Sequence, residues 1–291
     1  MKKSSVIAIG SVLIIAFAAL VYFGVIHRRG TPADFVPAKS PLLKAPYIAK
    51  SIDLSKGVSS EIWDSLNGTT IEMMHQTTVF PWGKSLSSPV TVQAFHNGAE
   101  IFFRVAWKDA TEDWLVKPGA FSDACAVMFN LEPEFKPSSI VMGTNGSVDI
   151  WQWKAFQNHE FWGEHKEKPL HSETFADYHY PFENEEILAV SRTETRSAVS
   201  ELHASGVATL ARKEKQTVSG RGIWKDGAWE VVFSRPLDND TGMKSVNLKE
   251  GTKVNCAFAV WNGSNKDRGS RKSISGWAEL SLELKEVAKN L

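Results

Sequence analysis

Short apolar runs separated by tight turns dominate the chain after residue 60, and they restrict its fold more than any other feature. Val90–Phe95 and Ile101–Trp107 are rich in β-branched and aromatic residues, and the Asn97-Gly98 pair between them favours a hairpin turn. Asp226-Gly227 separates two more runs in the same way. The pattern predicts a mainly β protein, an antiparallel β-sandwich with a few helices. The other expected strands are Ala124–Phe129, Val148–Trp153, Gly220–Trp224, Trp229–Phe233, Val254–Trp261 and Trp277–Leu284.

The first 50 residues differ from the rest of the chain. An apolar run from Val6 to Ile26 follows two lysines, and at 1.5 Å per helical residue it spans about 31 Å, roughly one hydrocarbon core. We therefore expect residues 1–29 to be an uncleaved membrane anchor, with a signal peptide cleaved after the Ala16-Phe17-Ala18 stretch as the alternative. Residues 30–50 carry four prolines and are expected to form a semi-rigid spacer, followed by the folded domain at 51–291.

Residues 183–217 interrupt the β pattern. Glu183–Glu186 is acidic, and Ser191–Lys215 is rich in Ser, Thr, Glu, Arg and Lys. We expect a long insertion, either helical or a loop. A flap over a ligand and a plain solvated loop both remain open for it.

Charge and cysteine usage exclude several classes of protein. Lys+Arg and Asp+Glu both total 33, so the chain has no overall basic field for nucleic acid. Cys125 and Cys256, the only cysteines, share strand parity with apolar neighbours and are expected to be small buried hydrophobes, with a disulfide as the alternative. The chain has no Cys-x-x-Cys-His motif for covalent haem and too few cysteines for an all-Cys iron–sulfur cluster.

Two sets of segments resemble known families. The opening Glu61–Asp64, and the first hairpin followed by Lys108–Asp113, resemble the front half of the sandwich shared by family 9 carbohydrate-binding modules and DOMON haem domains. Later segments resemble the haem-b-binding gamma subunit of the molybdenum enzymes related to ethylbenzene dehydrogenase. These segments are Phe121–Phe129, Val141-Met142-Gly143, Asp149–Ala155, Ala204–Leu210, Gly222–Trp229, Phe233–Leu237, Val260–Asn265 and Arg271-Lys272-Ser273.

The resemblance implies a non-catalytic electron-transfer subunit that holds one non-covalent b-type haem between Met142 and Lys272. Its partners would be an iron–sulfur beta subunit, a molybdenum catalytic alpha subunit, and a soluble cytochrome or quinone-linked carrier. The resemblance also implies a position on the periplasmic side of the membrane, or secretion if the leader is cleaved. The substrate of the complex and the direction of electron flow are not indicated.

Without the resemblance, these two residues would attract little notice. A methionine in an apolar run is usually core packing, and a lysine in a basic cluster is usually solvated. Thioether sulfur suits ferrous haem, and Gly143 beside Met142 would leave room for a flat ring. Only a neutral lysine amine can bind iron, which requires burial. The rival methionines are Met73, Met74 and Met128, and the rival lysine is Lys266.

Other candidate sites are weaker. His159, His165, His171 and His179 lie near Trp162, Tyr178 and Tyr180, but their spacing matches no compact zinc motif. Glu185 and Glu186 are expected to be solvent-facing charges rather than a glycosidase acid pair. The chain has no nucleophile-elbow, P-loop or dinucleotide fingerprint. The alternative functions are a haem-free carbohydrate- or ligand-binding sandwich and an assembly subunit of a redox complex.

Overall fold

The computed structural model describes residues 40–77, 85–116, 119–132, 146–163, 197–206, 209–237 and 245–285. They belong to one compact unit that begins at Ser40. The expected membrane helix, Val6–Ile26, lies outside the described residues. Within the described part of the chain, no helix is long and apolar enough to cross a bilayer.

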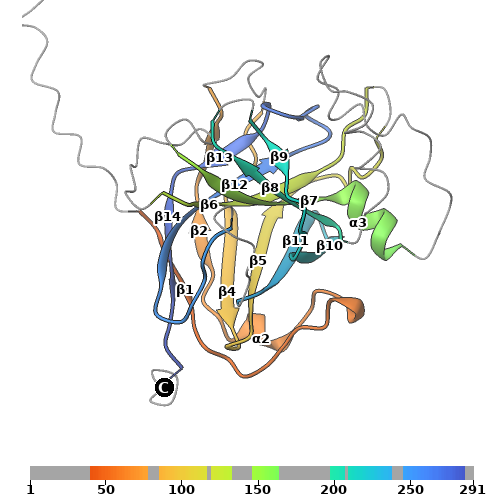
Figure 1. Ribbon diagram of the computed structural model, residues 1–291. Coiled ribbons are helices and arrows are strands. Elements are labelled where there is room, and N and C mark those ends of the chain that lie inside the picture. The colour runs from red at the N-terminus through yellow and green to blue at the C-terminus, as the bar shows by residue number, and fades with distance from the viewer. Residues whose placement is uncertain are drawn as a thin grey trace, which may run out of the picture. The chain divides into compact units, whose positions relative to one another are not determined.

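Two β-sheets pack face to face, which confirms the predicted sandwich (Figure 1). The larger sheet follows the order β1-β14-β12-β6-β7-β8-β9, and β13 joins β12 to β3. Its strands are β1 (Leu42–Ala45), β3 (Met73–His75), β6 (Ala124–Asn130), β7 (Val148–Lys154), β8 (Val199–Ala204), β9 (Ala211–Arg212), β12 (Lys253–Trp261), β13 (Ser273–Ser275) and β14 (Ala278–Leu282). The smaller sheet has the order β10-β11-β5-β4-β2. Its strands are β2 (Thr69–Ile71), β4 (Val90–His96), β5 (Glu100–Lys108), β10 (Ser219–Lys225) and β11 (Ala228–Pro236).

Helical structure is sparse in the described residues. A single 3₁₀ turn, η1 (Leu54–Lys56), and the one-turn helix α2 (Glu61–Asp64) precede β2. The longer helix α3 (Ala155–Trp162) directly follows β7 at one end of the larger sheet (Figure 1). These elements leave the sheets as the main source of buried surface.

Both predicted hairpins form, for the expected backbone reason. β4 and β5 pair antiparallel across a turn in which Gly98 has a φ of 87°. β10 and β11 pair across Asp226 and Gly227, whose φ values are 52° and 77°. Positive φ at both central residues is the type I′ geometry that Asp-Gly favours, because its twist matches that of the strands. β11 also pairs with β5, so the two hairpins form most of the smaller sheet.

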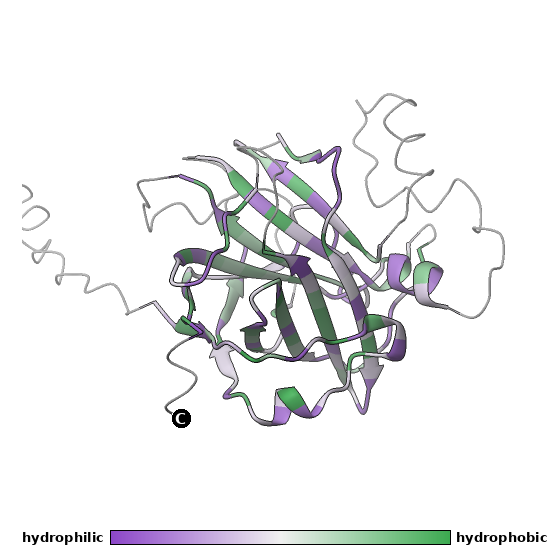
Figure 2. Ribbon diagram, turned by 60° about the horizontal axis from the view of Figure 1, so that its bottom comes forward, coloured by the Kyte–Doolittle hydropathy of each residue, from purple (hydrophilic) through white to green (hydrophobic). Residues whose placement is uncertain are grey.

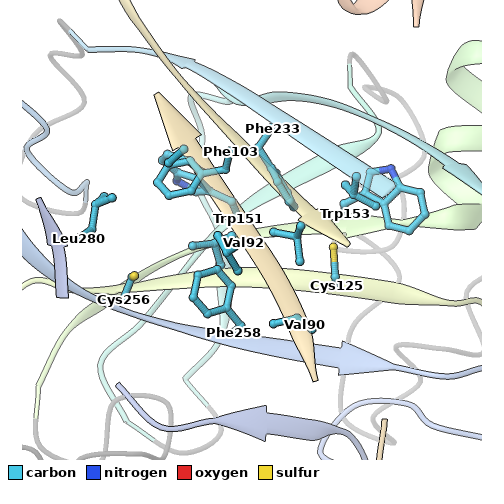
Figure 3. Close-up of a cluster of buried hydrophobic side chains, with 14 of the residues drawn as sticks. Val90, Val92, Phe103, Cys125, Trp151, Trp153, Phe233, Cys256, Phe258 and Leu280 are labelled. Carbon is cyan, nitrogen blue, oxygen red and sulfur yellow. The ribbon is translucent and has the colours of Figure 1, made fainter. Parts of the chain in front are cut away.

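The core lies between the sheets and is built from alternate residues of each strand. Cys125, Val127 and Phe129 of β6 belong to this core, as the sequence predicted. Figure 3 shows Cys125 there together with Trp151 and Trp153 of β7. The figure shows Cys125 and Cys256 at separate places in the core; both are buried and free, so the disulfide alternative is wrong. Figure 2 shows apolar residues along the strands of both sheets. The many aromatic rings supply large buried areas to this interface.

Two segments differ from the sequence-based expectation. Residues 42–45, expected in the spacer, form β1, which pairs with β14 in the only parallel pairing among the described strands. Pro41 and Pro46 flank β1 without interrupting it, because proline is tolerated at strand ends and β1 is an edge strand. The expected insertion at 183–217 contains β8 and β9, so its described part belongs to the larger sheet; residues 183–196 lie outside the described residues.

A buried ionic cluster includes two charged residues of that segment, Glu201 and Lys213. The Lys213 ammonium lies 2.7 Å from Asp149 and 3.3 Å from Glu201, and all three side chains are almost fully buried. The Arg235 guanidinium, from the other sheet, lies 3.6 Å from Asp149. Burial raises the pKa of Asp149, while Lys213 and Arg235 act in the opposite direction. The cluster therefore joins β7 and β8 to β11 through charges rather than apolar contacts.

Candidate functional site

The larger sheet has a second apolar face, directed away from the smaller sheet. Residues that alternate with the core positions form a separate buried cluster on this side, which we call the outer face. The cluster comprises Ala124, Ala126, Val148, Ile150, Leu202, Ala204 and Trp261, with Met128 and Ala259 packed against it. Apart from Met128 and Ala259, these side chains are at most 7% exposed, so the outer face is a second apolar layer of the folded chain and not an open surface.

Alanines occupy the middle of the outer face. Ala259 is the Cα partner of Ala126, and Ala257 is the partner of Met128 on the neighbouring strand. We call Ala124, Ala126, Ala257 and Ala259 the alanine floor. Cross-strand neighbours lie about 4.5–5.5 Å apart, so four methyl groups create a shallow apolar area between larger side chains. A flat apolar group can approach the backbone more closely here than over leucine or phenylalanine.

Lys272 reaches the outer face from one end of the floor. It precedes Ser273, which pairs with Val260, and its side chain is only 6% exposed. The Lys272 Nζ lies 4.9 Å from the centroid of the Trp261 ring. Among the described residues, no carboxylate or hydrogen-bond acceptor pairs with this amine. Burial lowers the pKa of Lys272 to about 8, which makes the neutral amine accessible near physiological pH.

The turn before Lys272 is fixed by hydrogen bonds on both sides. Arg268 and Arg271 exchange backbone hydrogen bonds of 3.0 and 2.9 Å. The Trp261 indole donates to the Gly269 carbonyl at 3.0 Å, and the Gln76 side chain donates to the Ser270 carbonyl at 2.9 Å. These hydrogen bonds fix the backbone of the turn, and they therefore fix where the Lys272 side chain begins on the outer face.

Buried aspartates hold the loop between Trp261 and this turn. Asn262 donates to Asp109 at 3.0 Å, and the Gly263 N–H donates to Asp123 at 2.8 Å. A Cβ on Gly263 would lie 2.0 Å from the Phe121 carbonyl oxygen, so only glycine fits there. Burial raises the pKa of Asp123 to about 7, with a smaller contribution from the charge of Asp109.

The structure separates several of the sequence-based candidates. Met73 lies in the core between the sheets and Met74 is 42% exposed, so neither reaches the outer face as a buried ligand. Met128 lies on the outer face beside the floor. Met142 lies outside the described residues. Lys266 is exposed, with its backbone in the left-handed region, which leaves Lys272 as the buried lysine of this loop.

Of the four clustered histidines considered as a metal site, the structure describes only His159. His159 stacks on Trp114, with ring centroids 3.8 Å apart, which accounts for its position in α3. His165, His171, His179, Glu185 and Glu186 lie outside the described residues. Within the described ranges, no group of three or more His, Cys, Asp or Glu side chains is arranged to hold a metal ion.

Sequence reasoning missed the other polar residues of the outer face. Gln152 and Lys154 alternate with Ile150 along β7 and are nearly fully buried, as is Ser200 on β8. The signal was present in the strict alternation of Val148–Lys154, which places Lys154 on the same side as Ile150. Trp261 was noted only as part of a motif, although its ring contacts Lys272.

Comparison with known proteins places this arrangement in a family. The sequence profile described as ethylbenzene dehydrogenase matches residues 60–273. The chain belongs to this family. Its match begins at the α2 turn and ends just after Lys272, so it contains the whole outer face.

Two relatives extend the ethylbenzene dehydrogenase family assignment. A Haloferax mediterranei protein, provisionally named a respiratory nitrate reductase haem subunit, is 25% identical over 272 residues, which covers 93% of this chain and 81% of the relative. The chlorate reductase gamma subunit of Ideonella dechloratans is 23% identical over 226 residues, which covers 75% of this chain and 76% of the relative. The chain is therefore homologous to gamma subunits of oxidoreductase complexes.

Solved structures give weaker similarity. A family 9 carbohydrate-binding module from Caldicellulosiruptor kristjanssonii, in complex with glucose, superposes with a TM-score of 0.43 at 8% identity, covering 83% of this chain and 95% of the module. A Bacteroides uniformis protein provisionally described as carbohydrate-binding gives a TM-score of 0.45 at 10% identity, covering 84% of this chain and all of that one. No conclusion about a ligand follows from similarity at this level.

Proposed function

We propose that this protein is the electron-transfer subunit of a molybdenum oxidoreductase and carries one non-covalent b-type haem on the outer face. Met142 and Lys272 are proposed as the axial ligands of the iron. The haem supplies reversible one-electron transfer at iron when it is bound. In this proposal the chain itself is not catalytic, and its residues bind, orient and shield the group.

The observation that carries the proposal is the state of Lys272. A buried ammonium without a carboxylate partner is costly, and proteins rarely keep one without a use for it. A solvated lysine with a pKa near 10.4 costs about 4.6 kcal/mol to deprotonate at pH 7, whereas a pKa of about 8 reduces this to about 1.4 kcal/mol. Burial therefore removes about two thirds of the cost of presenting a neutral amine to a metal.

The alanine floor supports a flat ligand rather than a globular one. Ala126 and Ala259 present only methyl groups to this side of the sheet, and Ile150, Leu202 and Trp261 belong to the same buried cluster. Apolar walls of this kind exclude water, which would otherwise compete for an iron coordination site. The residues present thus fit a macrocycle with one amine ligand entering from the Trp261 end.

The length of the chain before β7 supports Met142 as the second proposed ligand. Lys272 lies at the end of the sheet marked by Lys154, and Gly146 precedes β7 at the other end. The six steps of β7 between Val148 and Lys154 span about 20 Å. Residue 142 is four residues from Gly146, a stretch that extends at most about 14 Å. A methionine at 142 and a lysine at 272 can therefore meet over the middle of the outer face.

The partners and the location are also proposals, which the family resemblance suggests. We propose an iron–sulfur beta subunit and a molybdenum alpha subunit as partners, with a soluble cytochrome or quinone-linked protein as the external carrier. The names of the nitrate reductase and chlorate reductase relatives support a complex of this kind. We further propose that residues 51–291 lie on the periplasmic side, tethered by the apolar run Val6–Ile26.

A visible absorption spectrum of the full chain, produced with haem available, tests the proposal. We expect a low-spin b-type alpha band on reduction, with haem extractable by acid acetone. The Lys272→Leu variant is expected to bind haem with a high-spin or ligand-exchangeable iron, and Lys266→Leu is the matched control that keeps the wild-type spectrum. A chain that takes up no haem would instead favour a ligand-binding sandwich or an assembly subunit.

A further inference from the structure

A second lysine is buried on the same face as Lys272. Lys154 is the last residue of β7, and its φ and ψ of −133° and 137° keep it in the strand alternation. Its side chain therefore points to the outer face and is 5% exposed. Its Cα partner is Ala124, whose partner on the other side is Trp261. Lys154 and Lys272 thus flank the same end of the alanine floor from opposite sides.

Two uncharged polar residues extend this side of the face. Gln152 and Ser200 are Cα partners on β7 and β8, and both are buried. Gln152 is also the partner of Ala126, so the polar groups adjoin the floor directly. The Gln157 amide, from α3, lies 3.3 Å from the Ser200 hydroxyl. We call Lys154, Gln152 and Ser200 the polar edge.

We propose that the polar edge is a carboxylate-binding subsite that receives the propionates of the haem and fixes its orientation on the face. This inference rests on the proposed function. Haem is an apolar disc with two carboxylates on one side, and the outer face has matching halves: methyl groups on β6 and β12, and an ammonium, an amide and a hydroxyl on β7 and β8.

Other orientations are disfavoured by the cost of burying charge. Carboxylates turned toward Met128 or Ala257 would lie on apolar side chains, and burying them there without a paired donor costs several kcal/mol per ion. Lys272 contributes no charge when its neutral amine binds iron, so the charge on this face comes from other cations, and Lys154 is the one at the Lys272 end; Arg212, the Cα partner of Leu202, lies on the far strand β9. Lys154 and Gln152 have interactions of their own in the protein. An ammonium has three N–H donors, so an engaged lysine can still donate to a carboxylate.

The test pairs a change in the ligand with a change in the protein. Apoprotein of the full chain is titrated with haem b and with its dimethyl ester, which has the same ring and no carboxylates. Wild-type protein is expected to bind haem b about tenfold to a hundredfold more tightly than the ester, the range for charge-assisted hydrogen bonds. Lys154→Leu is expected to reduce this preference to about twofold, and Lys154→Arg to retain most of it.

Controls and contrary outcomes separate this inference from the haem proposal. The control Lys225→Leu changes an exposed lysine and should keep the wild-type preference for haem b. Gln152→Leu should lower this preference partly, and it replaces Lys154→Leu as the test if that variant does not fold. Equal binding of both ligands by wild-type protein refutes the subsite while leaving the haem site intact. Equal weakening of both ligands by Lys154→Leu shows a purely structural role. Loss of the axial nitrogen ligand in that variant would overturn both assignments, and binding of neither ligand by wild-type protein would refute the proposed function.

Discussion

Replacing Lys272 with leucine is expected to stabilise the haem-free protein while it removes the proposed iron ligand. The wild-type amine is buried without a partner among the described residues, so the folded apoprotein bears the cost of desolvating an ammonium. Lowering the pKa from 10.5 to about 8 corresponds to about 3 kcal/mol at 1.36 kcal/mol per pKa unit. The cation–π contact between the Lys272 ammonium and the Trp261 ring offsets about 1–2 kcal/mol of this desolvation cost. The net gain in unfolding free energy for Lys272→Leu is therefore about 1–2 kcal/mol at pH 7.

The pH dependence gives this prediction a definite sign. Between pH 8 and 10.5 the unfolded chain still holds the Lys272 proton that the folded chain has lost, so the stability of the wild-type protein rises with pH in this window. The advantage of Lys272→Leu is present in full below pH 8 and shrinks as the pH rises to 10.5. Urea unfolding of both apoproteins across this range measures the difference directly.

Lys253→Leu is the matched control for this experiment. Lys253 pairs with Glu279 at 2.8 Å, and both side chains are exposed to solvent. Surface pairs contribute about 0–1 kcal/mol, so this change should cost little and show no comparable pH trend. A loss of stability in the Lys272→Leu apoprotein at pH 7 would refute the reasoning, because it would mean that the amine has a stabilising partner.

Four further predictions concern other parts of the chain. Met142→Ala should abolish the low-spin ferrous spectrum or strongly lower the midpoint potential, and Met128→Ala should do neither; an unchanged Met142→Ala spectrum means that another residue is the ligand. Lys213→Met leaves buried carboxylates undercompensated and should cost about 3–5 kcal/mol in chemical denaturation. The folded state holds the proton of Asp123 up to a pKa of about 7, so the stability difference should shift in favour of Asp123→Asn by up to about 4 kcal/mol between pH 4 and 7. The intact mass of membrane-purified protein should include the first residues of the sequence, and loss of about 18 to 26 residues would reveal a cleaved leader instead.

The sandwich could be predicted because its local signals agree with its packing. Asn97-Gly98 and Asp226-Gly227 require positive φ, and both turns adopt it. The alternation around Cys125 correctly separated core residues from the others, since one face of each strand meets the smaller sheet. β1 and β8 were missed for physical reasons. Prolines flank β1, and Glu201 of β8 is buried in an ion pair with Lys213 that no local pattern reveals.

The candidate site could be proposed only through the family resemblance. In sequence, Arg271-Lys272-Ser273 is a basic, small-residue stretch with the composition of a solvated loop. Its burial depends on two residues that precede it in the chain, Gln76 and Trp261. Their side chains donate hydrogen bonds to backbone carbonyls of the turn before Lys272. The alanine floor could not be predicted from the sequence either. Its alanines come from separate strands, and they become neighbours only because the strand register pairs Ala126 with Ala259.

The parallel pairing of β1 with β14 has a consequence for the order of events in the cell. β1 occupies residues 42–45 and β14 occupies 278–282, so the larger sheet closes only when nearly the whole chain is available. A ribosome or translocon releases β1 long before β14, so β1 has no pairing strand during most of synthesis. Binding of the proposed haem is therefore expected to be a late step that follows complete synthesis, and a chain that stalls before residue 278 should be degraded.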